Sequence, residues 1–304
     1  MRHITFSRNR LIRGTEGLLI GALAAKIRRF FTNTSGDNEV HDMNASNRNL
    51  ETLFRSAVRT CVMLMVCVLQ NANAQQPDIT HRPIGDLGLG AYATQNIVRG
   101  DDDSLLPLPY AYLDYGRFFA RLDTLGVKTF GLGYGYLELV ARVNFDGFDT
   151  DVPELQGLEK RSHSIPLGIG TFQKTPIGGI FLNAFHDVND SGGNLFEAVY
   201  AAKFMLGSVS FYPQAGVEYR DSKYVRYYYG VTPAESAASG YPQYEPNGAV
   251  NPVAALQVEI PVFGNIYLNL YWRHKWLDDS ITGSPIVEKD AADTGFVALS
   301  YRFK

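Results

Sequence analysis

Apolar and polar residues alternate along several stretches of this 304-residue chain. In 136–145, "YLELVARVNF", Leu, Ala, Val and Phe occupy the odd positions, and Tyr, Glu, Val, Arg and Asn occupy the even ones. Side chains of a β-strand point alternately to the two faces of its sheet, so this period predicts strands with one apolar face. The same period recurs in 86–94, 209–220, 250–260, 266–276 and 294–304.

The length of these stretches favours strands that cross a membrane. Each extends over about ten residues, whereas strands of soluble proteins peak near five or six. A strand tilted by about 45° needs roughly 9–11 residues to span a bilayer. Several of the stretches also carry aromatic residues at their ends: Tyr219, Trp272, Trp276, Tyr301 and Phe303.

The connections between the stretches are alternately short and long. Short ones lie near Lys174, Gly207 and Pro261, and the longest is 221–248. Outer-membrane barrels have short periplasmic turns, long external loops and an even number of strands. The segment 106–135 gives twelve strands if it is broken at Gly116 and at Thr124-Leu125, and ten if it is not. We predict twelve.

A secretory signal peptide is predicted at 43–74. Arg48, Arg55 and Arg59 precede a short apolar core in "CVMLMVCVLQNANAQ" (61–75), and Ala72-Asn73-Ala74 follows it. A basic flank, a short apolar core and an A-x-A site indicate cleavage after Ala74. Residues 1–42 are then an N-terminal extension from a mis-assigned gene start, with a genuine long leader as the alternative.

The polar face of the predicted strands is compatible with two fold classes, a soluble sandwich and a membrane barrel. In a soluble β-sandwich it would face solvent, and in a membrane barrel it would line a hydrated lumen while the apolar face meets lipid. Together with the export signal and the strand length, it predicts that 75–304 is an all-β, transmembrane antiparallel β-barrel of the bacterial outer membrane. Within this scheme Leu268 faces lipid and Asn269 a hydrated lumen.

Composition narrows the function further. Charged residues make up 19% of the chain, below the roughly 25% usual for soluble proteins. The predicted mature part, 75–304, has 18 basic and 26 acidic residues and no cysteine. A net charge near −8 argues against nucleic acid as a partner, and the stability of an exported chain without disulfides must come from its core or from barrel closure.

Three segments resemble the MipA/OmpV family of outer-membrane proteins. They are "LPYAYLDYGRFF" (108–119), "YYYGVTPAESAASGYPQYEPNGA" (227–249) and "ITGSPIVEKDAADTGFVALSYRF" (281–303). The resemblance implies an outer-membrane scaffold that links a murein hydrolase, a periplasmic lytic transglycosylase, to a murein synthase of the penicillin-binding protein class. It also implies porin-like or adhesion roles as alternatives. One departure is Lys304, because barrel chains usually end on the aromatic residue itself.

Two sets of residues are candidates for function. A candidate external interaction loop carries Tyr227, Tyr228, Tyr229, Tyr241 and Tyr244. Tyrosine is enriched in binding interfaces, and the alternative is that these side chains fold the loop over the barrel mouth as a plug. Candidate lumen charges are Glu138, Arg142, Glu218, Arg220, Arg273 and Lys275. They form either a satisfied interior network or the selectivity element of a narrow pore.

Chemistry at a catalytic or metal site is not expected. Asp101–Asp103 and "HDVND" (186–190) offer carboxylates, but a solvated loop and a strand end explain them without a metal. His163, His186 and His274 occur without a motif that orders them with a serine and a carboxylate, so an outer-membrane esterase or deacylase is disfavoured. We expect no enzyme and no cofactor, and lipid and lipopolysaccharide as the surroundings.

Overall fold

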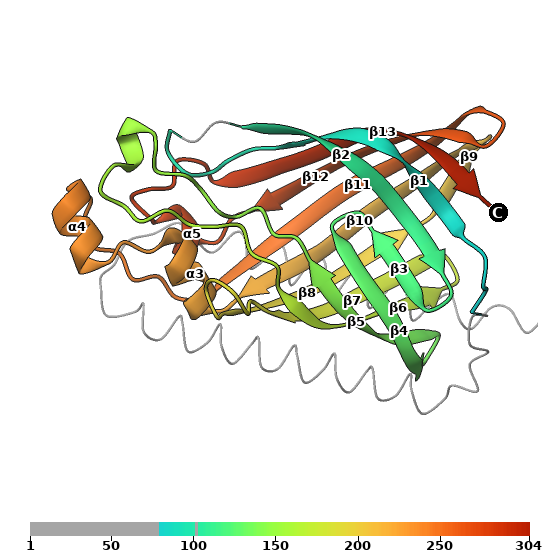
Figure 1. Cartoon of the computed structure of the whole chain (residues 1–304), viewed down its shortest axis with the longest axis horizontal. Helices are drawn as coiled ribbons and strands as arrows, with labels where there is room; N and C mark the ends of the chain where they lie inside the picture. Colours follow the sequence, from blue (N-terminus) through green and yellow to red (C-terminus); the bar gives the residue numbers. More distant parts are fainter. Residues whose placement is uncertain (1–78, 101–102) are drawn as a thin grey trace, which may run out of the picture. The chain divides into compact units, whose positions relative to one another are not determined.

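The structure, a computed structural model, describes residues 79–100 and 103–304, which contain a closed β-barrel (Figure 1). The predicted signal peptide, its cleavage after Ala74, residues 1–42 and Asp101-Asp102 lie outside these residues. Thirteen strands form one antiparallel sheet, and β11 also pairs with β10, which closes the barrel. The strands are β1 Ile84–Thr94, β2 Ser104–Tyr115, β3 Phe118–Arg121, β4 Thr124–Leu132, β5 Gly135–Arg142, β6 Leu167–Thr175, β7 Gly178–His186, β8 Asn194–Ala202, β9 Phe204–Leu206, β10 Val209–Arg220, β11 Ala249–Phe263, β12 Ile266–Trp276 and β13 Ala291–Phe303.

The barrel has twelve strands, as predicted, because β8 and β9 are two pieces of one strand. Both pair with β10, and the register is the same on either side of Lys203, with Gln214 opposite Ala201 and Phe211 opposite Phe204. Pro213 of β10 lies between these pairs and carries no N–H for a ladder hydrogen bond. Among the described residues, no helix combines the length and the apolar character needed to cross a membrane.

Two tight turns divide the segment 106–135 into separate strands, and the choice between ten and twelve strands depended on this division. Gly116 has a positive φ of 60° in the turn from β2 to β3, which confirms the predicted break there. The second turn lies at Leu122-Asp123, slightly before the predicted Thr124-Leu125, and Leu122 has a φ of 55°. Tight hairpin turns favour residues in the left-handed region, but leucine does not indicate such a turn, so the sequence did not locate this one.

The two faces predicted from the alternation are confirmed. Leu299 of β13 is 56% exposed on the outside of the barrel, and Leu139 of β5 is exposed on the same side. Glu138 of β5 and Asn269 of β12 point inward. The expectation of a hydrated lumen at Asn269 is wrong, because this side chain is 0% exposed and its Nδ2 donates to Ser300 Oγ. The interior is packed between β12 and β13.

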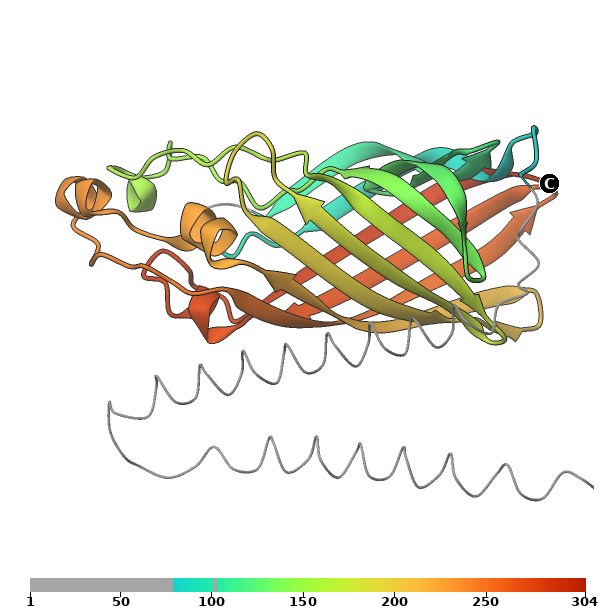
Figure 2. The same cartoon turned by 90° about the horizontal axis from the view of Figure 1, so that it is seen from below.

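The external connections fold into a cap at the end of the barrel opposite the C-terminus (Figures 1 and 2). It contains α3 Ser222–Tyr229, α4 Pro233–Ser239, α5 Asp279–Thr282 and the short helix η1 Pro153–Leu155. Side chains that precede the helices satisfy free N–H groups: Asp221 accepts from Tyr224 N, and Thr232 forms a capping box with Glu235. The buried apolar residues of the cap are Ile97, Val98, Phe148, Leu155, Leu158, Tyr224, Val225, Tyr228, Tyr229, Val231, Ala249, Ile281, Ile286 and Val287.

Adjacent residues of β10 test the two faces. We expect Ala215→Arg, on the lipid face, to hinder insertion, since Arg at the midplane of a barrel wall costs about 2–4 kcal/mol. Gln214→Arg should insert normally, because Gln214 borders the interior cavity. The fraction of protein that migrates as the compact form before boiling measures insertion. Equal damage from both substitutions would contradict the assigned faces.

Candidate interior site and cap

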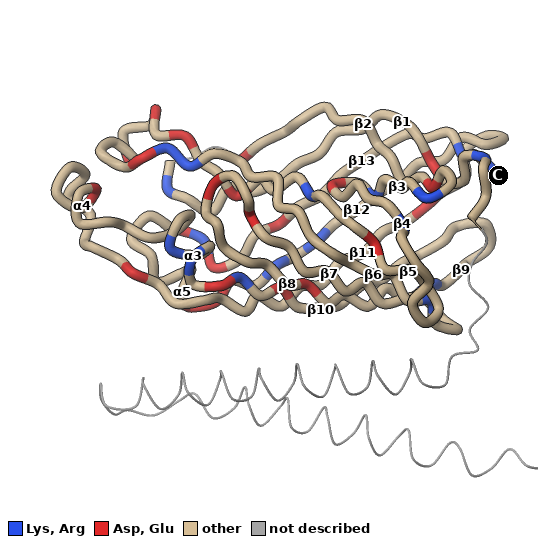
Figure 3. Tube along the Cα trace, turned by 60° about the horizontal axis from the view of Figure 1, so that its bottom comes forward, with Lys and Arg blue, Asp and Glu red and all other residues tan. Residues whose placement is uncertain are grey.

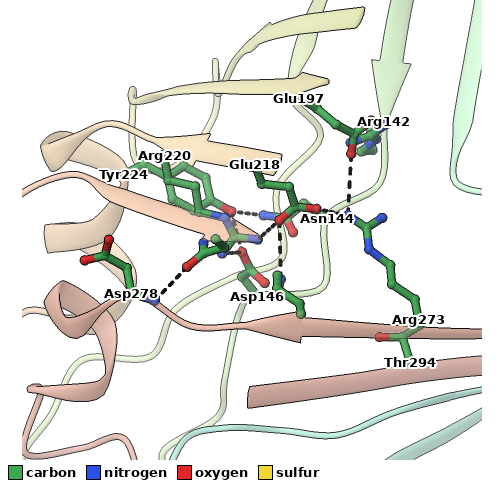
Figure 4. Close-up of polar contacts among 12 residues, drawn as sticks. Arg142, Asn144, Asp146, Glu197, Glu218, Arg220, Tyr224, Arg273, Asp278 and Thr294 are labelled. Carbon is green, nitrogen blue, oxygen red and sulfur yellow. Dashed lines mark hydrogen bonds and ion pairs between the residues drawn. The ribbon is translucent and has the colours of Figure 1, made fainter. Parts of the chain in front are cut away.

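Acidic and basic residues occur along the barrel strands as well as in the cap (Figure 3). Below the cap, charged side chains of the interior form a connected group (Figure 4). Arg142 of β5 donates two hydrogen bonds to Glu197 of β8, at 3.1 and 3.0 Å. Arg273 of β12 pairs with Glu218 of β10 and lies 3.6 Å from Glu197. Lys275 of β12 lies 3.7 Å from Glu218. The two carboxylates, on neighbouring strands, are therefore bridged by cations from other strands of the barrel.

The group exists because two carboxylates face each other. Glu197 and Glu218 are direct partners in the pairing of β8 with β10, and like charges at such positions repel. Arg142 comes from β5, which two strands separate from β8, and Arg273 from β12, which β11 separates from β10. Both arginines reach across the interior to neutralise the carboxylates, so they brace the barrel as well as carry charge.

Five of the six predicted lumen charges belong to this group. Arg220 joins it through Glu218, at 3.6 Å, and also pairs with Asp146. The sixth, Glu138, belongs to a separate pair, in which Arg121 donates two hydrogen bonds of 2.8 Å to its carboxylate. Sequence reasoning did not assign Asp146 to the lumen, because it lies past the end of β5 in a segment that was read as a loop.

The interior group is continuous with the cap. Tyr224 of α3 donates to Asp146 Oδ2 at 2.8 Å, and Arg220 Nη1 donates to Tyr229 Oη at 3.3 Å. The pKa of Asp146 is lowered even though burial raises it, because Arg220 and Lys275 stabilise the charged form. Cap helix α3 is therefore fixed to the charged residues inside the barrel.

A cavity of about 1040 Å³ runs along the interior. Its roof includes four buried cap residues: Ile97, Val98, Phe148 and Tyr229. Seven basic and five acidic side chains line it, an excess of two positive charges. Lys174 and Lys203 line the end away from the cap, and Lys203 Nζ lies 5.5 Å from the ring centre of Tyr212. The cavity is accordingly covered at the cap end, and two lysines line the opposite end.

The tyrosines of the candidate interaction loop hold the cap together. Tyr228 and Tyr229 are buried, and Tyr227, Tyr241 and Tyr244 are partly buried against the same apolar cluster. Their hydroxyl groups reach other loops: Tyr228 donates to Ser162 O, Tyr241 to Glu154 O and Tyr244 to Ser280 O. This arrangement matches the plug alternative, and an external partner would reach only the three partly buried rings.

A buried ion pair links two loops of the cap. Arg161 Nη2 lies 2.6 Å from Glu235 Oε1, and both side chains are buried. Glu235 also accepts hydrogen bonds from the backbone N–H groups of Glu159 and Thr232. Burial raises the pKa of Glu235, but these bonds and Arg161 outweigh it and hold that pKa below its usual value. The sequence signal for this site is the capping box Thr232-x-x-Glu235.

The histidines and the acidic segments are not gathered into one site. His163 packs against Phe145, His186 Nδ1 is 3.0 Å from Asn194 Oδ1, and His274 Nδ1 is 2.9 Å from Asp293 Oδ1. Asp187 is buried and accepts from Ser191 N and Oγ, so it organises its own loop. Within the part of the chain that the structure describes, no three His, Cys, Asp or Glu residues form a metal-binding group.

A twelve-stranded barrel with an apolar exterior, a charged interior and a folded cap defines a bacterial outer-membrane β-barrel protein. A family model described as MltA-interacting protein MipA matches residues 87–303, and the chain belongs to this family. This confirms the resemblance seen in the sequence and places the protein in the outer membrane, where its relatives are found.

Several relatives align over most of their length. The chain is 28% identical to the putative outer membrane protein YiaT of Escherichia coli K12, over 71% of this chain and 90% of that protein. It is 24% identical to the MltA-interacting protein of the same strain, over 71% and 89%. It is 25% identical to the outer membrane protein OmpV of Vibrio cholerae, over 74% and 88%. The crystal structure of the outer membrane enzyme PagL covers 72% of this chain and 99% of its own, with 9% identity and a TM-score of 0.22, too low to support any argument.

Removal of Arg273 should weaken the barrel. We expect Arg273→Ala to leave Glu197 and Glu218 facing each other with fewer cations. Loss of one partner of a fully buried pair costs roughly 3–5 kcal/mol, and the loss here is smaller because Arg273 is partly exposed to the cavity. The urea midpoint for unfolding from vesicles measures the effect. Lys174→Ala, which removes a cavity cation without an ion pair among the described residues, should leave the midpoint unchanged; an equal fall would contradict the bracing role.

The Arg161–Glu235 pair should hold the cap closed. We expect Glu235→Gln to make the cap sensitive to added protease while the barrel keeps its compact migration, because Arg161 stays buried with a weaker partner. In the unaltered protein the pair stabilises fully above the ordinary Glu pKa of about 4.3, and this stabilisation is lost as pH falls through the lower folded pKa. Protection should therefore fade under acid. Glu245→Gln, which alters the exposed pair with Arg226, is the control, and equal sensitivity in both variants would refute the idea.

Proposed function

We propose that this protein is an outer-membrane scaffold that holds a murein hydrolase and a murein synthase together in the envelope. The observation that carries the proposal is the folded cap, whose buried residues roof the interior cavity. A barrel closed in this way is poorly suited to free diffusion of solutes and well suited to a binding role. The family supports the choice of partner, since one relative is described as MltA-interacting protein.

A periplasmic partner can reach the turns at the end away from the cap. These include Pro176-Ile177, Gly207-Ser208 and Gly264-Asn265. Large apolar side chains stand beside the last two turns: Leu206 is 75% exposed and Phe263 is 83% exposed. Part of this apolar surface meets the membrane interface, and the turns themselves project beyond it. They offer a rim on which a lytic transglycosylase and a penicillin-binding protein can dock.

Insertions into the turns test the scaffold. We expect a short polar insertion at Gly207-Ser208 or Gly264-Asn265 to reduce recovery of both murein enzymes in a pull-down from crosslinked envelopes, with normal barrel migration. The matched control replaces 233–243 by a short linker, which removes α4 at the external end and retains the backbone pairing of Val231 with Tyr244. That deletion should leave the pull-down intact. Loss of binding in the deletion alone would contradict either the orientation or the scaffold role.

A small-solute pore is the second candidate, because the cavity is large and carries an excess of positive charge. In planar bilayers, a pore of this kind would conduct anions better than cations, and deletion of 233–243 would raise its conductance. Neither proposal involves catalysis. The contacts of the residues described above are explained without a catalytic reaction. In both proposals, lipid and lipopolysaccharide surround the apolar face of the barrel.

A further inference from the structure

The barrel wall has a gap beside β2. Strand β3 is only four residues long and pairs with Tyr112–Tyr115 at one end of β2 (Figure 1). The remainder of β2, residues 104–111, pairs with β1 on one side. On its other side, no described strand continues the ladder beyond the hydrogen bond from Leu122 N to Ala111 O. The turn Leu122-Asp123 therefore forms the lower border of an opening.

Two prolines shape the open edge. Successive residues of a strand direct their backbone groups to opposite neighbours. Since Ala111 directs its carbonyl to Leu122, the odd-numbered residues of β2 point toward the gap. Pro107 and Pro109 are among them, and neither has an N–H. The edge thus offers carbonyl oxygens but few donors, which disfavours addition of another β-strand.

The residues on the outer margin of the gap are apolar and belong to the lipid face, whereas Ser104 and His163 line the cavity behind it. Leu105 on one side is 71% exposed, and Leu125 and Val143 on the other side are also exposed. An open sheet edge is not tolerated against lipid unless something covers its polar groups or the gap lines a cavity. The edge of β2 borders the second cavity described below, which is the tolerated case, and the outer margin of the gap is apolar.

The gap leads to the interior. A second cavity of about 400 Å³ is lined by Ser104 and Leu106 of β2 and by His163 across the opening. It shares Thr94, Asn96, Phe145, Gly147 and Phe148 with the large interior cavity. Phe145 stands between the two, since its ring centre is 5.6 Å from that of Tyr92 on β1 and 5.7 Å from that of His163. Phe145 therefore lies at the junction of the two cavities.

We propose that this gap admits one acyl chain of an outer-leaflet lipid, which lies along the proline edge of β2 and reaches the interior cavity past Phe145. The apolar borders and the continuity with the lipid face favour hydrocarbon, and the missing N–H groups disfavour a strand. The ion pair of Lys160 with Asp149, at 2.5 Å, lies on the external side of the second cavity, where the polar part of the lipid would remain.

Quenching by brominated lipid tests the proposal. A cysteine at Leu108, an interior position of β2 that borders the cavity, carries a bimane label and has no competitor, because 75–304 contains no cysteine of its own. The protein is isolated from outer membranes, labelled in urea and refolded into phosphatidylcholine vesicles with or without brominated acyl chains. Leu299→Cys, on the lipid face, gives the upper reference. Gln257→Cys, buried in the closed part of the wall, gives the lower one.

We expect quenching at Leu108→Cys close to that at Leu299→Cys and several-fold above that at Gln257→Cys. Adding Phe145→Ala should increase it, whereas Leu139→Ala, on the lipid face away from the gap, should not. Quenching at Leu108→Cys as low as at Gln257→Cys, in protein with normal compact migration, would overturn the proposal. Efficient crosslinking between two chains through Pro107→Cys would overturn it too, because a second copy would then cover the edge. Neither result bears on the pull-down of murein enzymes.

Discussion

Backbone hydrogen bonding within the membrane is the constraint on which the rest of this structure depends. No water is available there, so each N–H and C=O of the wall must be satisfied by the protein. Pairing of β1 with β13 and of β10 with β11 closes the sheet into a barrel, although an unpaired edge remains along residues 104–111 of β2. Where β3 is too short to pair with all of β2, Pro107 and Pro109 remove donors that would otherwise remain unpaired. The prolines thus reduce the number of unpaired N–H groups that the short β3 strand leaves on β2.

Closure of the wall also determines what the interior can be. The pairing of β8 with β10 places Glu197 opposite Glu218 in the interior. The repulsion is relieved by arginines that reach over from β5 and β12, and these side chains line the interior cavity. Near Asn269 the interior is packed. A barrel stabilised in this way is a braced body with an internal cavity, which suits a protein that holds partners at its rim.

Alternation in the sequence was enough to predict several strands and their faces, because these depend on residues that are neighbours in sequence, whereas the even strand number came from the general rule for bacterial barrels. Features that depend on distant segments were not predictable. The turn at Leu122 has no turn-forming residue, and the facing carboxylates become visible only when the register is known. Phe145 was assigned to the lipid face by its odd position, yet its ring contacts Tyr92, whose side chain points inward. Tyrosines of the 221–248 loop could be listed, but burial of Tyr228 and Tyr229 depends on four other segments.

More contacts close the barrel at its capped mouth than at the gap in its wall. This difference affects where the interior can open to its surroundings. Closure of the cap rests on a large apolar cluster, a buried ion pair and bonds from α3 to the interior charges. At the gap, Phe145 packs between Tyr92 and His163 at the junction of the two cavities. Local opening requires least free energy where the fewest buried contacts must break. Opening at the wall therefore requires fewer buried contacts to break than opening at the mouth, and it occurs at a site remote from the turns at the far end of the barrel.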